Sequence, residues 1–171
     1  MTKSSGKVIK VLIASLVLLV LFLVVANILG NTADYYSTVK KMVSCIENND
    51  SEKLESCASS MSIAALGGEE KAHESITADI KKIMDIYNAE VGRITNASYT
   101  VTNEQELSIE RVEAIKKQFS DLYGLDTSGI KRILKVGIIL KLKGELSDRD
   151  YQMSIYLVRE SGGWKLYNGN L

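Results

Sequence analysis

The residues whose types suggest chemistry are two cysteines, Cys45 and Cys57, and one histidine, His73. The cysteines lie six residues on either side of Ser51, where a polar stretch interrupts two helical patterns. A helical hairpin would bring them level, and a disulfide there would add about 3 kcal/mol of stability. Two buried free thiols are the alternative, because cysteine also packs as a small hydrophobic side chain. The spacing favours the disulfide.

His73 has two acidic neighbours on its own predicted helix, Glu70 and Glu74. A histidine oriented by a carboxylate is a general base, but a single histidine among glutamates is typical of a solvated surface. We expect the surface position. The chain has no Walker loop, no nucleophile elbow, no H-E-x-x-H and no G-x-G-x-x-G, so we predict no catalytic residues, no metal and no cofactor.

An apolar segment, residues 11–29, decides the surroundings of these side chains. It contains no charge, and Ser15 and Asn27 are its only polar residues. As a helix it would be about 28 Å long, close to the roughly 30 Å of bilayer hydrocarbon. We therefore predict a transmembrane helix that anchors the chain in the lipid bilayer.

The charges around this segment predict its orientation. Three lysines precede it and the first charge after it is Asp34, which places residues 1–10 in the cytoplasm and residues 32–171 outside. A cleaved signal peptide is the alternative, although its apolar region is normally about 7 to 15 residues. We therefore predict a single-pass protein of the cell membrane, whose outer domain lies close to the membrane surface. A disulfide persists in that compartment.

The composition of residues 32–171 fits one domain of ordinary size. It holds 18 basic and 21 acidic residues, a net charge of −3. Nucleic-acid binding normally requires a concentrated basic surface. We therefore expect no nucleic-acid partner.

Four segments of this domain have the apolar spacing of amphipathic helices: 33–48, 51–61, 69–87 and 109–122. Asp50 or Ser51 is expected to cap the second helix. The fourth helix is expected to begin after Ser108 and to end at Gly124. The expected buried stripes of the last two helices are Ala72, Ile76, Ile80, Ile83 and Tyr87, and Ile109, Val112, Ile115, Phe119 and Leu122.

Strand patterns occur in residues 91–101, 134–142, 151–157 and 164–166. Short connections between the last three favour antiparallel pairing, and Gly137 is expected to mark a bulge. The sequence therefore predicts an α+β fold, with helices packed on an antiparallel sheet behind the transmembrane helix.

This order of elements resembles the nuclear transport factor 2-like superfamily, which has a cystatin-like fold. Two segments carry the resemblance: the polar break Asn-Asn-Asp-Ser at 48–51, and the closing hairpin Val-Arg-Glu-Ser-Gly-Gly-Trp-Lys-Leu at 158–166. It implies a curved sheet that wraps around helices as a cone. Uncharacterised extracytoplasmic domains of this type, held by a membrane anchor, are frequent in Gram-positive bacteria.

The predicted inward positions of the long strands are all apolar and either fill the core or line a pocket for a lipid or small molecule. They are Val136, Ile138, Leu140, Met153 and Ile155. Basic residues gather on or next to one strand, at Lys131, Arg132, Lys135, Lys141 and Lys143. Such residues attract anionic polymers or protect a sheet from aggregation, and we favour protection.

These patterns together indicate a non-catalytic binding or assembly domain of the cell envelope, anchored in the membrane. The expected partners are the lipid bilayer, through residues 11–29, and envelope proteins. The alternative is a lipid or small-molecule carrier, or an enzyme, that uses the interior of the cone as its pocket.

Overall fold

The computed structural model describes residues 35–167. The predicted cytoplasmic segment 1–10 and membrane span 11–29 lie outside the described residues. Within residues 35–167, no helix has both the length and the apolar character needed to cross a membrane.

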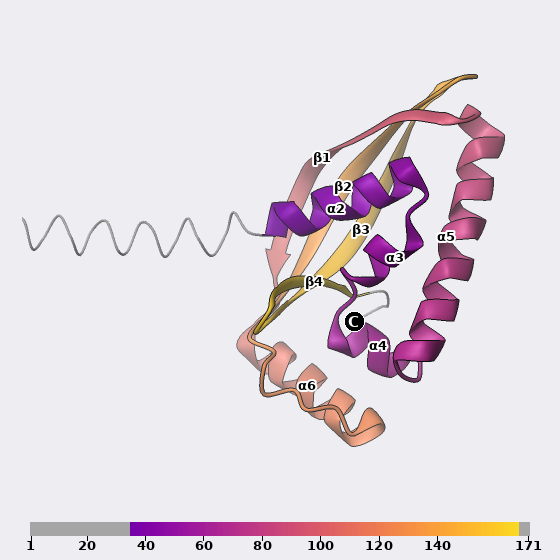
Figure 1. Ribbon diagram of the computed structural model, residues 1–171. Coiled ribbons are helices and arrows are strands. Elements are labelled where there is room, and N and C mark those ends of the chain that lie inside the picture. Colours follow the sequence, from indigo (N-terminus) through magenta and orange to yellow (C-terminus); the bar gives the residue numbers. More distant parts are fainter. Residues whose placement is uncertain (1–34, 168–171) are drawn as a thin grey trace, which may run out of the picture. The chain divides into compact units, whose positions relative to one another are not determined.

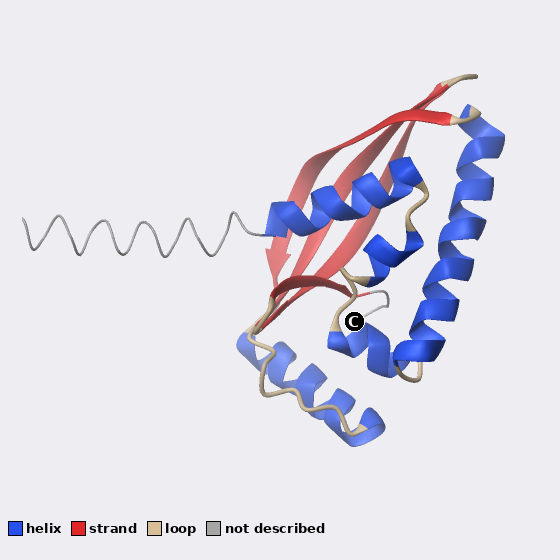
Figure 2. Cartoon of the chain, viewed as in Figure 1, coloured by secondary structure: helices blue, strands red, loops and turns tan. Residues whose placement is uncertain are grey.

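The described chain is an α+β domain with helices beside an antiparallel sheet (Figures 1 and 2), which confirms the predicted class at this level. Four helices come first, followed by a strand, a helix and three strands. The helices are α2 (Tyr35–Asn48), α3 (Ser51–Glu55), α4 (Ser60–Ala65), α5 (Glu69–Val91) and α6 (Ile109–Tyr123). The strands are β1 (Ile94–Glu106), β2 (Arg132–Gly144), β3 (Asp148–Glu160) and β4 (Gly163–Tyr167).

The four strands form an open sheet in the order β1-β2-β3-β4, and every neighbouring pair is antiparallel. This confirms the pairing expected of the last three strands. The expected irregularity near Gly137 is also present, but the extra residue belongs to β1: Thr102 has no partner between the pairs Val101–Ile138 and Asn103–Gly137. A Cβ atom on Gly137 would approach the Thr102 hydroxyl to 2.8 Å, so the glycine makes room for the bulge.

The main core lies between the sheet and helices α2 and α5. Helix α2 crosses the sheet and buries Tyr35, Val39 and Val43, as its apolar spacing predicts. The Tyr35 hydroxyl donates to the Glu104 carboxylate of β1. The Thr38 hydroxyl donates to a backbone carbonyl of β4 over 2.9 Å. Helix α2 is therefore joined to both edge strands of the sheet.

The prediction of a single helix over 51–61 is wrong, because the chain forms two short helices there, α3 and α4. Asp50 caps α3 by accepting from the Lys53 amide at 2.9 Å, as predicted. Beyond α3 the backbone pairs with β4 instead of continuing the helix: the Leu166 amide donates to the Cys57 carbonyl, and the Ser59 amide donates to the Leu166 carbonyl, both over 2.7 Å. Ser59 then caps α4.

Helix α5 continues to Val91, beyond the predicted end at 87, so β1 begins at Ile94 rather than at 91. Its buried stripe also differs from the prediction at one position. Met84 is buried, whereas Ile83 is 40% exposed. One residue of helix rotation is about 100°, which places Ile83 at the margin of the buried face.

Helix α6 builds a second, smaller core with Val112, Ile115 and Phe119. These side chains pack with Ile133 and Val158, whose sequence neighbours Leu134 and Leu157 belong to the main core. Because successive residues of a strand point to opposite faces, the two cores lie on opposite faces of the sheet.

The buried face of α6 is narrower than predicted, because two of its five expected residues are exposed. Ile109 is 80% exposed and Leu122 is 64% exposed, since the helix buries only the side chains spaced three and four residues apart at its centre. Its ends are as predicted: Ser108 accepts from the Arg111 amide at 3.3 Å, and Gly124 has a φ of 63° in the left-handed region.

Gly144 supplies a test of how closely α5 and β2 approach. A Cβ atom on Gly144 would lie 2.0 Å from the Val91 carbonyl oxygen. Gly144→Ala should therefore lower the free energy of unfolding by about 2 kcal/mol or more. Thermal unfolding of the full chain measures this loss. Gly162→Ala is the matched control, because no atom lies within 4 Å of its added Cβ, and an equal effect in both variants would contradict the close approach.

Candidate functional site

The described domain contains an apolar cavity of about 440 Å³ between α5 and the sheet. Helix α5 supplies Ile76, Ile80 and Met84 to one wall, and β3 supplies Met153 and Ile155 to the opposite wall. The volume falls in the range of about 300 to 1,000 Å³ that small-molecule sites occupy. This cavity is the candidate functional site.

The short helix α3 contributes Leu54 to the lining of this cavity. Figure 1 shows α3 between α2 and α5, and it contacts both helices. Met153 and Ile155 remain half-buried, whereas Ile138 and Leu140 on the neighbouring strand are fully buried. Helix α5 contacts β3 through the rings of Tyr87 and Tyr151, but the part of the sheet's apolar face at Met153 and Ile155 is only partly covered.

The floor of the cavity includes residues of the junction between α3, α4 and β4. Ala58, Ser62 and Leu166 line it, and the same segment holds the parallel bridge between Ala58 and Leu166. The buried Ser62 hydroxyl donates to the Leu166 carbonyl over 3.2 Å. This hydrogen bond pairs two of the polar groups of the floor with each other.

The charged residues of the cavity are at its rim. Asp79 and Lys82 lie one turn apart on α5, and both are exposed. Within residues 35–167, the buried polar side chains are Thr38, Ser59 and Ser62, and each makes a hydrogen bond. The lining also includes the tyrosine side chains Tyr87 and Tyr167. The cavity wall is therefore mainly apolar, with a few hydroxyl groups, and its charged side chains lie at the entrance.

The sequence predicted part of this lining. Met153 and Ile155 line the cavity, but Val136, Ile138 and Leu140 do not, because these three side chains are completely buried in the main core. The contribution of α5 was not foreseen. The isoleucines spaced along that helix are the one signal in the sequence, and the same spacing is typical of a helix face that packs on a core.

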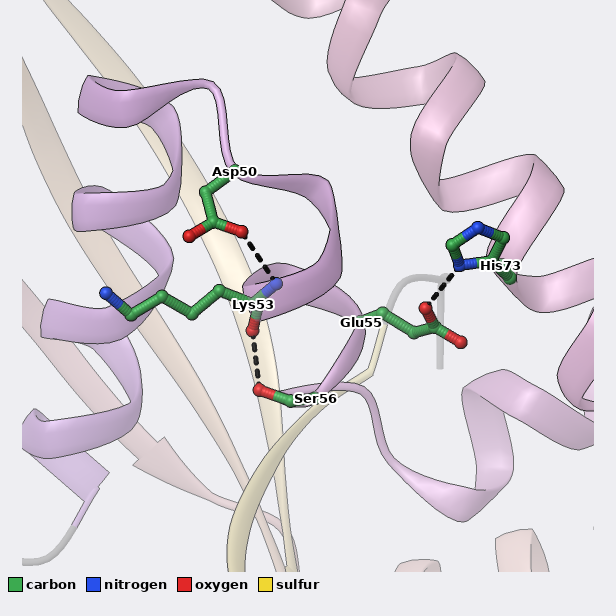
Figure 3. A network of polar contacts seen from close by, with 5 residues as sticks. All are labelled: Asp50, Lys53, Glu55, Ser56 and His73. Atoms are coloured by element: carbon green, nitrogen blue, oxygen red, sulfur yellow. Dashed lines mark hydrogen bonds and ion pairs between the residues drawn. The ribbon is translucent and has the colours of Figure 1, made fainter.

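His73 lies on the surface, as expected, and its side chain is 52% exposed. Its partner is a residue of another helix rather than Glu70 or Glu74: the Nδ1 atom lies 2.6 Å from the Glu55 carboxylate of α3 (Figure 3). The hydrogen bond to Glu55 and its negative charge raise the pKa of His73, with smaller contributions from Glu52 and Glu74. The pair joins α3 to α5 outside the cavity.

Cys45 and Cys57 are both buried, and the structure holds them as free thiols. The structure therefore matches the alternative of two buried free thiols. The disulfide stays a prediction. The two lie close enough to interact: burial raises the pKa of Cys45 to about 11, and Cys57 adds to this effect. The Cys57 thiol donates to the Lys53 carbonyl over 3.4 Å.

The basic residues of β2 do not form a uniform positive surface. Lys141 lies directly opposite Asp150 of β3, and Lys143 lies opposite Asp148. Cross-strand pairs of opposite charge stabilise a sheet. These positions therefore carry balanced charge rather than an anion-binding surface. The expected protection of a sheet edge does not apply to them, because β2 is an inner strand paired with both β1 and β3.

The other three basic residues also differ from the expected row. Arg132 lies on the face of β2 opposite to Lys135, Lys141 and Lys143. It donates to both Glu106 carboxylate oxygens, at 2.6 and 2.7 Å. Lys135 lies over the Tyr156 ring at 5.8 Å from its centre. Lys131 is exposed and precedes β2, so it takes no place in the strand.

Comparison with known proteins adds no relative to these observations: no protein-family model and no curated protein matches this chain. Within the part of the chain that the structure describes, no group of three or more His, Cys, Asp or Glu side chains could hold a metal ion. The candidate site therefore rests on the geometry of the cavity.

The contact between His73 and Glu55 should make stability depend on pH. Because the folded-state pKa of His73 lies above the ordinary value of 6.5, the stabilisation is complete below about pH 6.5 and is lost as the pH rises through the folded value. Unfolding of the full chain between about pH 5 and 8 measures this dependence. In the His73→Gln variant, stability should change less with pH between about pH 5 and 8. An unchanged profile would show that the contact does not persist in solution.

Proposed function

We propose that this chain is a non-catalytic binding domain, anchored in the cell membrane by residues 11–29 and working outside the cytoplasm. The apolar cavity beside α5 is the observation that carries the proposal. Its wall offers buried apolar contact with Ile76, Ile80 and Met84, and burial of apolar surface drives association with apolar compounds. Anchoring and location rest on the charge and length of the N-terminal segment.

The chemistry of the cavity supports binding rather than catalysis. General acid-base catalysis requires a titratable group held within hydrogen-bond reach of the reacting atoms. The charged groups that line the cavity, Asp79 and Lys82, are exposed at its rim, where water competes for every polar contact. The other polar side chains of the lining are Ser62, Tyr87 and Tyr167, and none of them is a carboxylate or a histidine. A bound compound would meet mainly hydrocarbon in the interior and solvated charge at the entrance.

The arrangement of the described elements also supports the proposed membership of the nuclear transport factor 2-like superfamily. Several helices precede the long strands and pack against an antiparallel sheet. The closing hairpin turns at Ser161 and Gly162, between the paired residues Glu160 and Gly163. The cavity between α5 and β3 would then be the open part of the proposed cone. The part of the cone at β2 would be filled by the buried side chains Val136, Ile138 and Leu140.

A small apolar photoprobe tests the binding function directly. We expect a phenyldiazirine, added to the full chain in lipid nanodiscs and activated by light, to label Met84 and Met153. Peptide mass spectrometry locates the label. Ile80→Trp should abolish cavity labelling by filling the space, whereas Ile109→Trp, at an exposed position on α6, should leave it unchanged.

Absence of label at both methionines in the unaltered chain would overturn the binding function. An envelope protein that co-purifies with such an unlabelled chain would instead favour assembly.

The proposed compartment predicts a disulfide between Cys45 and Cys57. Protein isolated from native membranes without reductant should yield the two cysteines as one linked peptide pair. The bond would stabilise the domain by about 3 kcal/mol, and the expected readout is a lower unfolding temperature after reduction. Cys57→Ser should remove that response. If both thiols of the native protein react with an alkylating reagent after unfolding, the disulfide is excluded.

A further inference from the structure

The cavity has an elongated shape. Along α5 its lining extends from Ile76 to Tyr87, and the eleven steps between these two residues correspond to about 16 Å of helix. A volume of about 440 Å³ over that length gives a mean cross-section of about 27 Å², or a width of about 5 Å. The space is therefore long and narrow.

These dimensions exclude a protein helix as the occupant, because a helix with its side chains is about 10 to 12 Å wide. An extended peptide is also unsuitable. Its closely spaced amide and carbonyl groups would need hydrogen-bond partners along their whole length, whereas the polar side chains of the lining are few: Ser62, Tyr87 and Tyr167, with Asp79 and Lys82 at the rim. The best-fitting occupant is narrow and has few polar groups along its length.

An unbranched hydrocarbon chain meets both conditions. At about 30 Å³ for each methylene group, similar to the volume of one water molecule in the liquid, the cavity holds about 14 methylenes. Met42, Met84 and Met153 contribute to the wall from three different elements. Methionine side chains are flexible and polarizable, so they adapt to the outline of a chain.

We propose that the cavity binds the hydrocarbon chain of a single-chain amphiphile, whose head group stays in water at the rim formed by Asp79 and Lys82. This inference rests on the proposed binding function and names its ligand class. The two rim residues have opposite charges and are exposed. Recognition therefore depends on the length of the chain more than on the charge of the head group.

Competition against the phenyldiazirine photoprobe tests the ligand class. Saturated fatty acids of increasing length are added to the full chain in nanodiscs, and their free aqueous concentrations are measured. The concentration that halves labelling of Met84 and Met153 should fall about fourfold for each added methylene. The fall should stop near about 14 carbons, where the cavity is full.

Two filling variants and one matched control separate the cavity from the surrounding lipid. Ile80→Trp fills it from α5, and Ile155→Trp fills it from the half-buried position on β3, which tolerates a larger side chain if the first variant misfolds. Both should remove labelling and competition, and Ile109→Trp should retain them. Lys82→Gln should weaken binding of a fatty acid by no more than about fivefold.

A lysophospholipid of the optimal length identifies the source of the chain. Competition by the fatty acid alone assigns a free acid, competition by the lysophospholipid alone assigns a membrane lipid, and competition by both shows that the chain is what the cavity recognises. If the probe labels the cavity but neither amphiphile competes, or if affinity does not depend on chain length, the inference is overturned while the binding function stands. Absence of cavity labelling by the probe overturns both.

Discussion

The backbone pairing of Cys57 and Ser59 with Leu166 organises the helical half of this domain. Its two hydrogen bonds of 2.7 Å join segments that are more than a hundred residues apart, and they have three consequences. They end α3 and start α4, they cover the outer edge of β4, which would otherwise present unpaired backbone groups, and they form the floor of the cavity at Ala58.

Helix α3 ends just before that pairing and lies between α2 and α5, as Figure 1 shows, and it contacts both helices. Leu54 of α3 lines the cavity together with the half-buried Met153 and Ile155 of β3. Protein interiors are normally packed without large voids. An apolar space of about 440 Å³ therefore sets this region apart from the filled core, and it supports the proposed binding role.

The charges of the described domain are arranged for structure. Lys141 and Lys143 lie opposite aspartates of β3, Arg132 forms a bidentate contact with Glu106, and His73 joins two helices through Glu55. The remaining charged groups near the cavity are exposed. Specificity in such a site comes from the shape and length of the apolar space, because the wall provides no buried charge to recognise a polar ligand.

The sequence by itself determined the α+β class, the antiparallel pairing of β2, β3 and β4, and the caps at Asp50, Ser108 and Gly124. These features depend on periodicity and on turn chemistry, which act between residues close in the chain. Only the tertiary structure decided that 51–61 breaks into two helices, that Met84 rather than Ile83 is buried, and that Glu55 is the partner of His73. It also separated Val136, Ile138 and Leu140, which fill the core, from Met153 and Ile155, which line the cavity. Alternation along a strand indicates which side chains face inward, but what covers them depends on contacts with elements far away in the sequence.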